Sequence, residues 1–324
     1  MNRLFAVLVV PITAVMVFAG CEDGVQGSPF SPAAEGDQGD GDEPADDAAD
    51  PGDPVLPEEP GLAGTFGMLL DVSVLQGGLP LLGGSPVESR NWYLVQAVPD
   101  GAGGLVTSER LCAVQLVPDT WVASPVVPKA FVEHLVPLRR EVILVEGEQG
   151  TAWITDRVCE VRGARLCDPE HDPLPGPDSI PDGPASCDDP CDGAACDQDG
   201  DGMPGMTTWL VGFYNCAIYS AHRWCSRLEG FADGEDRISG LVKDFSSEQV
   251  VLGASSGFCE AGTAVAVPDP CAARHYFEMV RLPQDADCDD VMALTGCDED
   301  PAGCAANPTL PLDPRGPAAG DPCQ

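Results

Sequence analysis

The feature that most constrains the fold of this chain is an alternation of apolar residues with polar or small ones. It is clearest near the start of the body, where Phe66, Met68, Leu70, Val72 and Val74 occupy every second position. Successive side chains of a strand point to opposite faces of a sheet, so this spacing predicts a strand with one buried face. Apolar residues do not recur at helical spacing over any useful length. We therefore expect an all-β fold.

Further strand-like segments follow along the chain, separated by turn signals such as Asp-Gly. They cover residues 91–98, 105–117, 141–146, 151–161, 208–219, 224–232, 238–242, 249–254 and 275–282. Short helices are expected at 129–135 and 288–294.

The body consists of two parts that resemble each other. Gly64 and Gly205 each open a strand, and Trp92 and Trp224 each follow an arginine and precede an Asp-Gly turn. This order predicts a diverged duplication, with two β-meander halves that form one antiparallel β-barrel or sandwich. Such an arrangement removes exposed strand edges.

Charge and composition divide the chain into segments. Residues 22–60 contain 13 acidic and no basic residues among many Gly, Pro and Ala, a composition typical of disorder. We expect a lipoprotein signal peptide (1–20), a disordered acidic tether (21–60), a first β half (61–165), an acidic Cys/Pro/Gly crossover (166–196), a second β half with a calcium loop (197–282) and a Cys-containing C-terminal tail (283–324).

The N-terminus has the pattern of an export signal, with Arg3, an apolar run and then small residues. Its end, Phe18-Ala19-Gly20-Cys21, resembles the bacterial lipobox, with Phe18 where Leu is usual. The resemblance implies lipidation of Cys21 and a lipid anchor in the bacterial cell envelope, with the outer membrane favoured over the inner one. The alternative is an uncleaved transmembrane anchor, but Pro11 interrupts the apolar run.

Cysteine count and net charge limit the chemistry further. The chain has 15 cysteines, and setting Cys21 aside leaves an even number, as expected for disulfides in an exported protein. A zinc site is the weaker alternative, because paired Cys-x-x-Cys motifs are lacking and the four histidines are scattered. The formal net charge of −37 makes nucleic acid an unsuitable partner.

The segment between the two halves carries the spacing of a calcium loop. Asp197, Asp199 and Asp201 fall at positions 1, 3 and 5, Gly202 takes the turn at position 6, and the Met203 backbone carbonyl falls at position 7. Alternate carboxylates can converge on one hard cation because the residues between them point away. The segment resembles the calcium loops of EF-hand, dockerin and thrombospondin type 3 proteins, which implies bound Ca²⁺.

The loop departs from the EF-hand at position 12, where Thr208 replaces the bidentate Glu, and a strand follows in place of a helix. Thr208 is a candidate ligand, and the remaining oxygen could come from Asp188, Asp189, Asp192, the 233–236 turn or water. We expect weak, structural calcium binding, with Kd about 10⁻⁴–10⁻³ M. The alternative is an ordinary acidic, Gly-rich turn.

A wider resemblance covers roughly residues 60–282. The DGDGxPGxT pattern, followed by strands that include Ser247–Ala254, is similar to uncharacterised exported bacterial lipoproteins. This family resemblance implies no activity.

The sequence lacks motifs for nucleophilic catalysis, zinc-dependent hydrolysis or nucleotide binding. We therefore do not expect an enzyme. A Ser-His-Asp triad stays open, because its members can come from distant residues. Two function classes remain. One is a module that binds a small apolar ligand or a surface partner, as barrels of the lipocalin type do. The other is a purely structural envelope protein. We expect the tryptophans to pack in the core; the alternative is that they line a ligand site.

Overall fold

The computed structural model describes residues 61–76, 85–118, 123–148, 150–180, 185–212, 215–260 and 266–295. Residues 1–60 lie outside this part of the chain, and with them Cys21, the expected signal peptide and the whole of the expected tether. Most of the C-terminal tail also lies outside it. Among the described residues, no helix has the length and apolar character needed to span a membrane.

The described part of the chain is dominated by antiparallel strands. They are β1 (Gly64–Gln76), β2 (Ser85–Pro99), β3 (Leu105–Pro118), β4 (Ala123–Val126), β5 (Leu138–Gly147), β6 (Gly150–Thr155), β7 (Val158–Arg162), β8 (Met206–Gly212), β9 (Cys216–Asp233), β10 (Arg237–Ala254), β11 (Ala266–Pro268) and β12 (Tyr276–Leu282). The short helices are α1 (Lys129–Glu133), α2 (Gly257–Glu260) and α3 (Cys288–Ala293). The expected all-β, disulfide-rich fold is confirmed.

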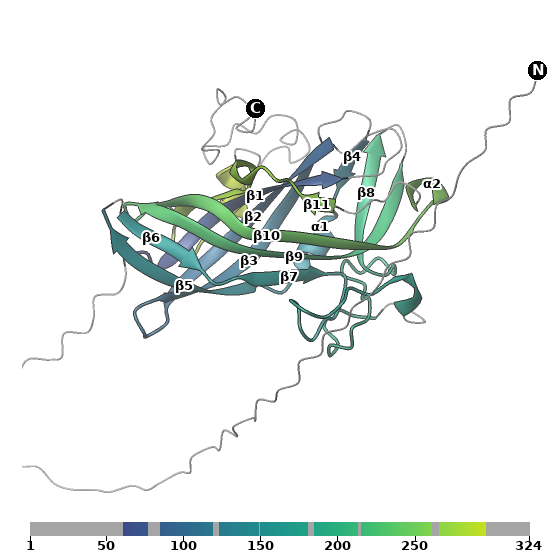
Figure 1. The fold of residues 1–324 in the computed structure, drawn as a ribbon, viewed down its shortest axis with the longest axis horizontal. Helices are drawn as coiled ribbons and strands as arrows, with labels where there is room; N and C mark the ends of the chain where they lie inside the picture. Colours follow the sequence, from purple (N-terminus) through teal and green to yellow (C-terminus); the bar gives the residue numbers. More distant parts are fainter. Residues whose placement is uncertain are drawn as a thin grey trace, which may run out of the picture. The chain divides into compact units, whose positions relative to one another are not determined.

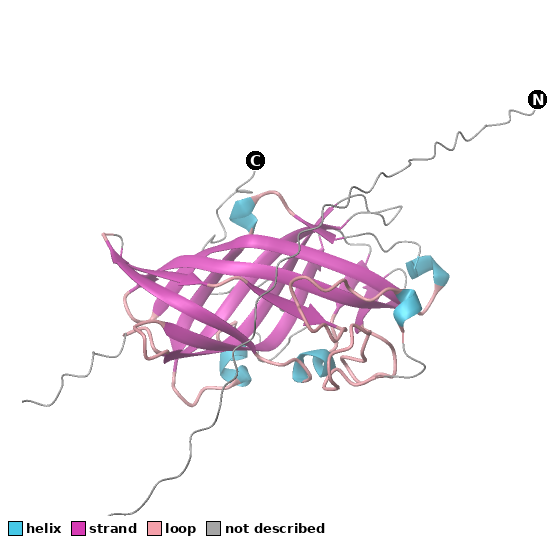
Figure 2. Ribbon diagram, turned by 60° about the horizontal axis from the view of Figure 1, so that its bottom comes forward, coloured by secondary structure: helices cyan, strands magenta, loops and turns pink. Residues whose placement is uncertain are grey.

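The strand pairing closes into a barrel. Its order is β1-β2-β3-β5-β6-β9-β10-β12, and β12 pairs in turn with β1, so the first strand meets the last. Figures 1 and 2 show the strands wrapping around one interior. One meander, β1 to β6, and a second, β9 to β12, meet at the β6–β9 and β12–β1 contacts. Of the two arrangements that the sequence allowed, barrel and sandwich, the chain adopts the barrel.

One edge of the long strand β9 is shared by three short strands. Pairing with β6, β7 and β8 follows in order along this edge, and β10 occupies the other edge. The sequence predicted one strand over 151–161, but these residues divide between β6 and β7. Two short strands are added at the end of the barrel where β8 lies: β4 pairs with β8, and β11 pairs with β1. These additional strands distinguish this end from the other.

Strand β9 is longer than the sequence predicted. The strand expected over 208–219 divides between β8, which ends at Gly212, and the start of β9. After β8, Asn215 Oδ1 accepts the Gly212 N–H at 3.2 Å. Strand β9 then continues to Asp233 without a break. The alternation is weak in its middle because His222 faces the interior beside polar groups.

Strand β10 joins two segments that the sequence predicted separately, 238–242 and 249–254. Its register with β9 shifts between Lys243 and Ser246, where Asp244 has a φ of 49°. A β-bulge of this kind inserts residues into one strand and bends it without ending the ladder. The bulge interrupts the period of two and hides the continuity of the strand from the sequence pattern.

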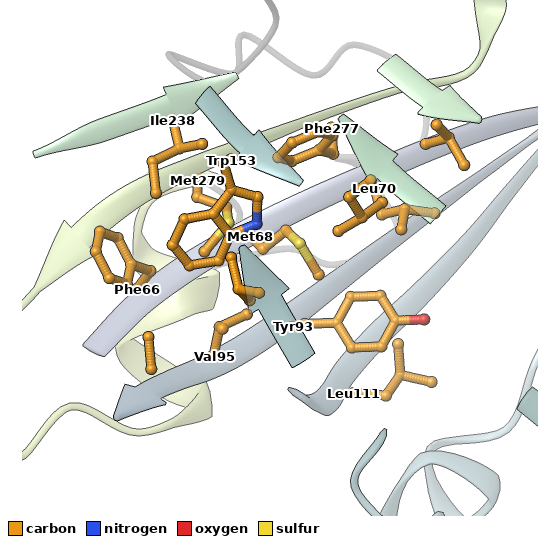
Figure 3. Close-up of a cluster of buried hydrophobic side chains, with 14 of the residues drawn as sticks. Phe66, Met68, Leu70, Tyr93, Val95, Leu111, Trp153, Ile238, Phe277 and Met279 are labelled. Carbon is orange, nitrogen blue, oxygen red and sulfur yellow. The ribbon is translucent and has the colours of Figure 1, made fainter. Parts of the chain in front are cut away.

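Apolar side chains from both meanders fill most of the barrel interior (Figure 3). The fully buried ones include Phe66, Met68, Leu105, Trp153, Leu228, Ile238, Phe277 and Met279. Burial of side chains of this size contributes about 1.5–3 kcal/mol each to stability. The filled interior fixes which face of each strand points inward.

Two glycines make room for the largest of these side chains. Trp153 of β6 is paired with Gly230, Gly230 with Gly240, and Gly240 with Phe277, so the row across four strands is large, small, small, large. A Cβ added to Gly230 would lie 2.3 Å from the Ser239 carbonyl oxygen and 2.9 Å from Phe277 Cζ. The absent side chains are therefore part of the packing.

Two covers pack on the outside of the barrel. Helix α3, capped by Asp287, packs on the outer face of β1 and β2 and is joined to β3 by the Cys112–Cys288 disulfide. Parts of residues 163–180 and 185–205 pack on the outer face of β9, where Leu166 and Leu174 share a buried apolar cluster with Tyr219. The expected crossover thus covers one face of the barrel.

Disulfides hold the strands and the crossover together. They join Cys112–Cys288, Cys159–Cys225, Cys167–Cys191, Cys187–Cys196 and Cys216–Cys259. Cys271 is also disulfide-bonded. Every cysteine within the described ranges is thus oxidised, which leaves no thiolate there for zinc.

The glycine row gives a test of the packing. We expect Gly230→Ala to lower the free energy of unfolding by about 1–3 kcal/mol, because its methyl group would overlap backbone and the Phe277 ring. In the matched control Gly253→Ala, the new Cβ meets only Tyr219 Cδ2, at 3.6 Å, and a change within about 0.5 kcal/mol is expected. Equal denaturation midpoints for the two variants would contradict this account of the row.

Candidate functional site

A cavity of about 100 Å³ lies inside the end of the barrel where β4 and β8 are added. Both meanders contribute to its wall. The lining residues are Val74, Val87, Ser89, Val114, Leu116, Pro125, Val127, Arg162, Met206, Thr208, Leu210, Ile218, His222, Trp224, Ser247 and Gln249. Met206 and Trp224 also belong to the filled core, so the cavity begins where close packing ends.

The wall of the cavity is mainly apolar and carries one charged side chain, Arg162. The Arg162 guanidinium stacks on the Trp224 ring, with Cζ 4.3 Å from the ring centroid, and lies 5.5 Å from that of Phe131. Its Nε donates to Glu160 Oε1, and Glu160 Oε2 accepts the Tyr93 hydroxyl at 3.2 Å. Its Nη2 is buried and has no hydrogen-bond partner among the described residues.

A second buried ion pair lies deeper in the barrel. Arg140 Nε donates to Glu109 Oε2 at 3.1 Å, and the two Nη groups donate to the carbonyl and hydroxyl oxygens of Ser226. Thr107 donates to the other Glu109 oxygen at 3.2 Å. Removing one partner of such a pair would leave an uncompensated buried charge and destabilise the barrel.

His222 lines the cavity next to Arg162. Its Nε2 lies 3.0 Å from Ser247 Oγ. Burial lowers the pKa of His222 to about 3, and the positive charge of Arg162 adds to this effect. The imidazole is therefore neutral at ordinary pH. As a base this weak it does not activate the Ser247 hydroxyl for nucleophilic attack.

A Ser-His-Asp group does assemble elsewhere, at Ser73, His275 and Asp269, all of them buried. The Ser73 hydroxyl donates to Asp269 Oδ2 at 3.1 Å, while His275 Nδ1 accepts the Ser73 backbone N–H and Nε2 faces the Asp269 carbonyl. In a catalytic triad the imidazole must contact the serine hydroxyl. The hydrogen bonds found here instead join β1 to the segment before β12.

Sequence reasoning missed the cavity residues Arg162 and His222. The signal that could have indicated Arg162 is the spacing Glu160-x-Arg162 in an otherwise apolar strand, which places both charges on one face. For His222 we find no comparable signal, because the inward direction depends on the pairing of β9 with β10. Trp224, in contrast, combines both roles considered for the tryptophans, core packing and cavity lining.

The predicted calcium-loop carboxylates lie together. One oxygen from each of Asp197, Asp199 and Asp201 falls within 4.8 Å of the others. The Asp197 carboxylate accepts three backbone N–H groups, from Gly200, Asp201 and Gly202. Gly202 has a φ of 84°, as the sharp turn at this position requires. The loop therefore has the turn geometry that the spacing predicted.

Asp199 is the buried member of this group, with 6% of its surface exposed. Its Oδ2 accepts the Thr207 N–H at 3.1 Å, and its Oδ1 has no partner within the part of the chain that the structure describes. Burial raises the pKa of Asp199, and the charges of Asp201 and Asp197 raise it further. A cation would relieve both the repulsion and the unmet hydrogen-bonding capacity.

The other predicted ligands lie in different surroundings. Met203 is on the exposed part of the loop, and Thr208 lines the barrel cavity, while Thr207 contacts the carboxylates through its N–H and hydroxyl. Asp189 and Asp192, considered as sources of a further oxygen, form ion pairs with Arg165. The three aspartates are thus the group that the fold brings together.

Comparison with known proteins finds no matching family model, no similar curated protein and no similar solved structure.

The buried imidazole gives a pH dependence with a definite sign. The unfolded chain binds a proton at His222 near the ordinary pKa of about 6.5, whereas the folded chain does so only near 3. The stability is therefore unaffected above about pH 6.5 and falls between about 6.5 and 3. We expect His222 to account for a loss of about 1 kcal/mol in the free energy of unfolding from roughly pH 7 to 5.5.

Denaturant unfolding of the wild type and His222→Gln over this pH range measures the effect, since carboxylates of ordinary pKa stay ionised there. The variant should show the smaller loss. Parallel pH profiles for the two proteins would contradict a neutral, buried imidazole.

Proposed function

We propose that this protein is a lipid-anchored protein of the bacterial cell envelope whose β-barrel binds a small apolar ligand. The single observation that carries the proposal is the cavity of about 100 Å³ inside one end of the barrel. Ligand sites are typically concave and mainly apolar, with a few placed polar groups, and the mouths of β-barrels are a common location. Arg162, His222 and Ser247 are such polar groups.

The size of the cavity limits the ligand. An engineered apolar cavity of about 150 Å³ holds benzene, and drug-sized ligands occupy roughly 300–1,000 Å³. A space of about 100 Å³ fits a molecule with a handful of heavy atoms, or the compact end of a longer one.

The proposed location rests on the N-terminal sequence and on the oxidised cysteines. A lipid on Cys21 would hold the protein at the membrane surface, with the outer membrane favoured. Disulfides persist in oxidising compartments outside the cytoplasm, which supports export.

We also propose that the Asp197–Asp201 loop binds Ca²⁺ in a structural role. Three carboxylates close together support this, since one of them is buried and has an oxygen without a partner among the residues that the structure describes. The loop leads directly into β8, whose Met206 and Thr208 line the cavity. Calcium here would hold the crossover against the barrel.

A purely structural envelope protein is the second candidate. The dense packing in the rest of the barrel and the many disulfides favour it. An occupied or empty cavity in natively purified protein distinguishes the two proposals.

A cavity-filling variant tests ligand binding. We expect cyclopentane to raise the melting temperature of the wild type, since a ligand at a hundredfold excess over Kd stabilises by about 2.7 kcal/mol. Val114→Phe should lose this response, because the ring occupies the cavity that Val114 lines. Val98→Phe makes the same change at a side chain that is 55% exposed and should respond like the wild type.

Mass spectrometry of protein purified from its native envelope then identifies the natural ligand. An unchanged melting temperature with every apolar probe, together with no co-purifying molecule, would favour the purely structural role.

Calcium binding is tested by thermal unfolding with Ca²⁺ and with chelator. We expect about 10 mM Ca²⁺ to stabilise the wild type by roughly 1.4–2.7 kcal/mol if Kd is about 10⁻³–10⁻⁴ M. Asp199→Asn should remove most of the shift. Asp178→Asn, at an exposed acidic residue outside the loop, is the matched control and should keep it. Identical melting curves with Ca²⁺ and with chelator would refute the site.

A further inference from the structure

Arg162 lines the cavity and carries one donor, its Nη2 group, that the described residues leave without a partner. The side chain is 4% exposed, and Nη2 has no hydrogen-bond partner among the described residues. Among the other polar side chains of the wall, Ser247 pairs with His222, Gln249 with Ser220 and Ser89 with Asn91. Buried donors are nearly always paired in native proteins, so an unpaired one on a cavity wall indicates a bound acceptor.

The charges in the barrel interior decide which acceptor fits. Arg162 is paired with Glu160 and Arg140 with Glu109, so the buried acidic and basic groups balance. His222 is neutral and brings no second positive charge. A ligand carboxylate would therefore add an uncompensated negative charge close to Glu160, which is costly in a buried site. An uncharged oxygen accepts the hydrogen bond without this cost.

Stacking limits where the oxygen can lie. The Trp224 ring lies on one face of the guanidinium, at 4.3 Å, so its N–H groups point outward in the guanidinium plane. Trp224, Val114 and Ile218 supply apolar wall on the cavity side. The site thus combines one directed donor with an apolar surface.

We infer that the cavity selects a compact apolar molecule that carries one uncharged oxygen acceptor, such as a ketone or an ester, and that Arg162 Nη2 donates to this oxygen. The inference rests on the proposed ligand-binding function and deepens it. Arg162 is the residue that determines specificity, and the apolar wall supplies the rest of the binding free energy.

Two probes of matching shape test the inference. Cyclopentanone presents a carbonyl oxygen, and methylenecyclopentane replaces that oxygen with a CH₂ group. Water solvates the ketone better than the hydrocarbon, so their Kd values cannot be compared directly. We therefore compare the ratio of the two Kd values in the wild type with the same ratio in a variant, in which the solvation difference cancels. NMR titration supplies each Kd.

The test variant is the double substitution Glu160→Gln and Arg162→Met, which removes the ion pair without leaving a lone buried charge. We expect the double substitution to weaken binding of the ketone at least tenfold more than binding of the hydrocarbon, as for the loss of a hydrogen bond to a charged group. Arg140→Lys alters a second buried arginine, which does not line the cavity, and should leave the ratio unchanged.

A measurement on the wild type covers the case in which the double variant does not fold. The ¹³C-carbonyl resonance of bound, labelled cyclopentanone should lie clearly downfield of its position in cyclohexane, as expected for a carbonyl that accepts from a guanidinium in an apolar site. A bound resonance at or upfield of that position would overturn the inference.

The outcomes separate the inference from the function on which it rests. If neither probe binds, the ligand-binding function itself fails. If both bind and their Kd ratio is the same in the double variant, only the role of Arg162 fails. Stronger binding of cyclopentanecarboxylate than of the ketone would overturn the choice of an uncharged acceptor, and a cavity that retains ordered water with every probe would overturn the inference.

Discussion

Closure of the sheet is the constraint on which the rest of this structure depends. The β12–β1 and β6–β9 pairings join two meanders into one ring, so the backbone hydrogen bonds of the ring strands are satisfied between neighbours. Once the ring is closed, alternate side chains of all its strands must share a single interior. The large–small–small–large row from Trp153 to Phe277 follows from this limited space.

The two ends of the barrel differ because β9 and β10 are longer than their partners. One end is filled by aromatic and aliphatic side chains, whereas the other is completed by the short strands β4, β8 and β11. The cavity lies at this second end, together with Arg162 and His222.

The Asp197–Asp201 loop and the cavity are neighbours through β8. Alternation along this strand turns Thr207 toward the aspartates and Met206 and Thr208 toward the barrel interior. Gly163 and Gly205 lie close to β9, since a Cβ would lie 2.7 Å (Gly163) or 2.6 Å (Gly205) from the Ser220 carbonyl oxygen. Order in the loop thus supports one wall of the cavity.

The sequence alone determined the all-β class, the disulfide-forming character and the Asp197–Asp201 loop, because period-two alternation, cysteine number and carboxylate spacing are local properties. It did not predict the continuity of β9 and β10, where a bulge and inward-facing polar residues interrupt the alternation. Nor did it indicate the cavity. Whether Arg162 and His222 face solvent, core or an internal space depends on strand register and on side chains far away in the chain. Only closure of the barrel, which brings these residues together with Trp224, decided that.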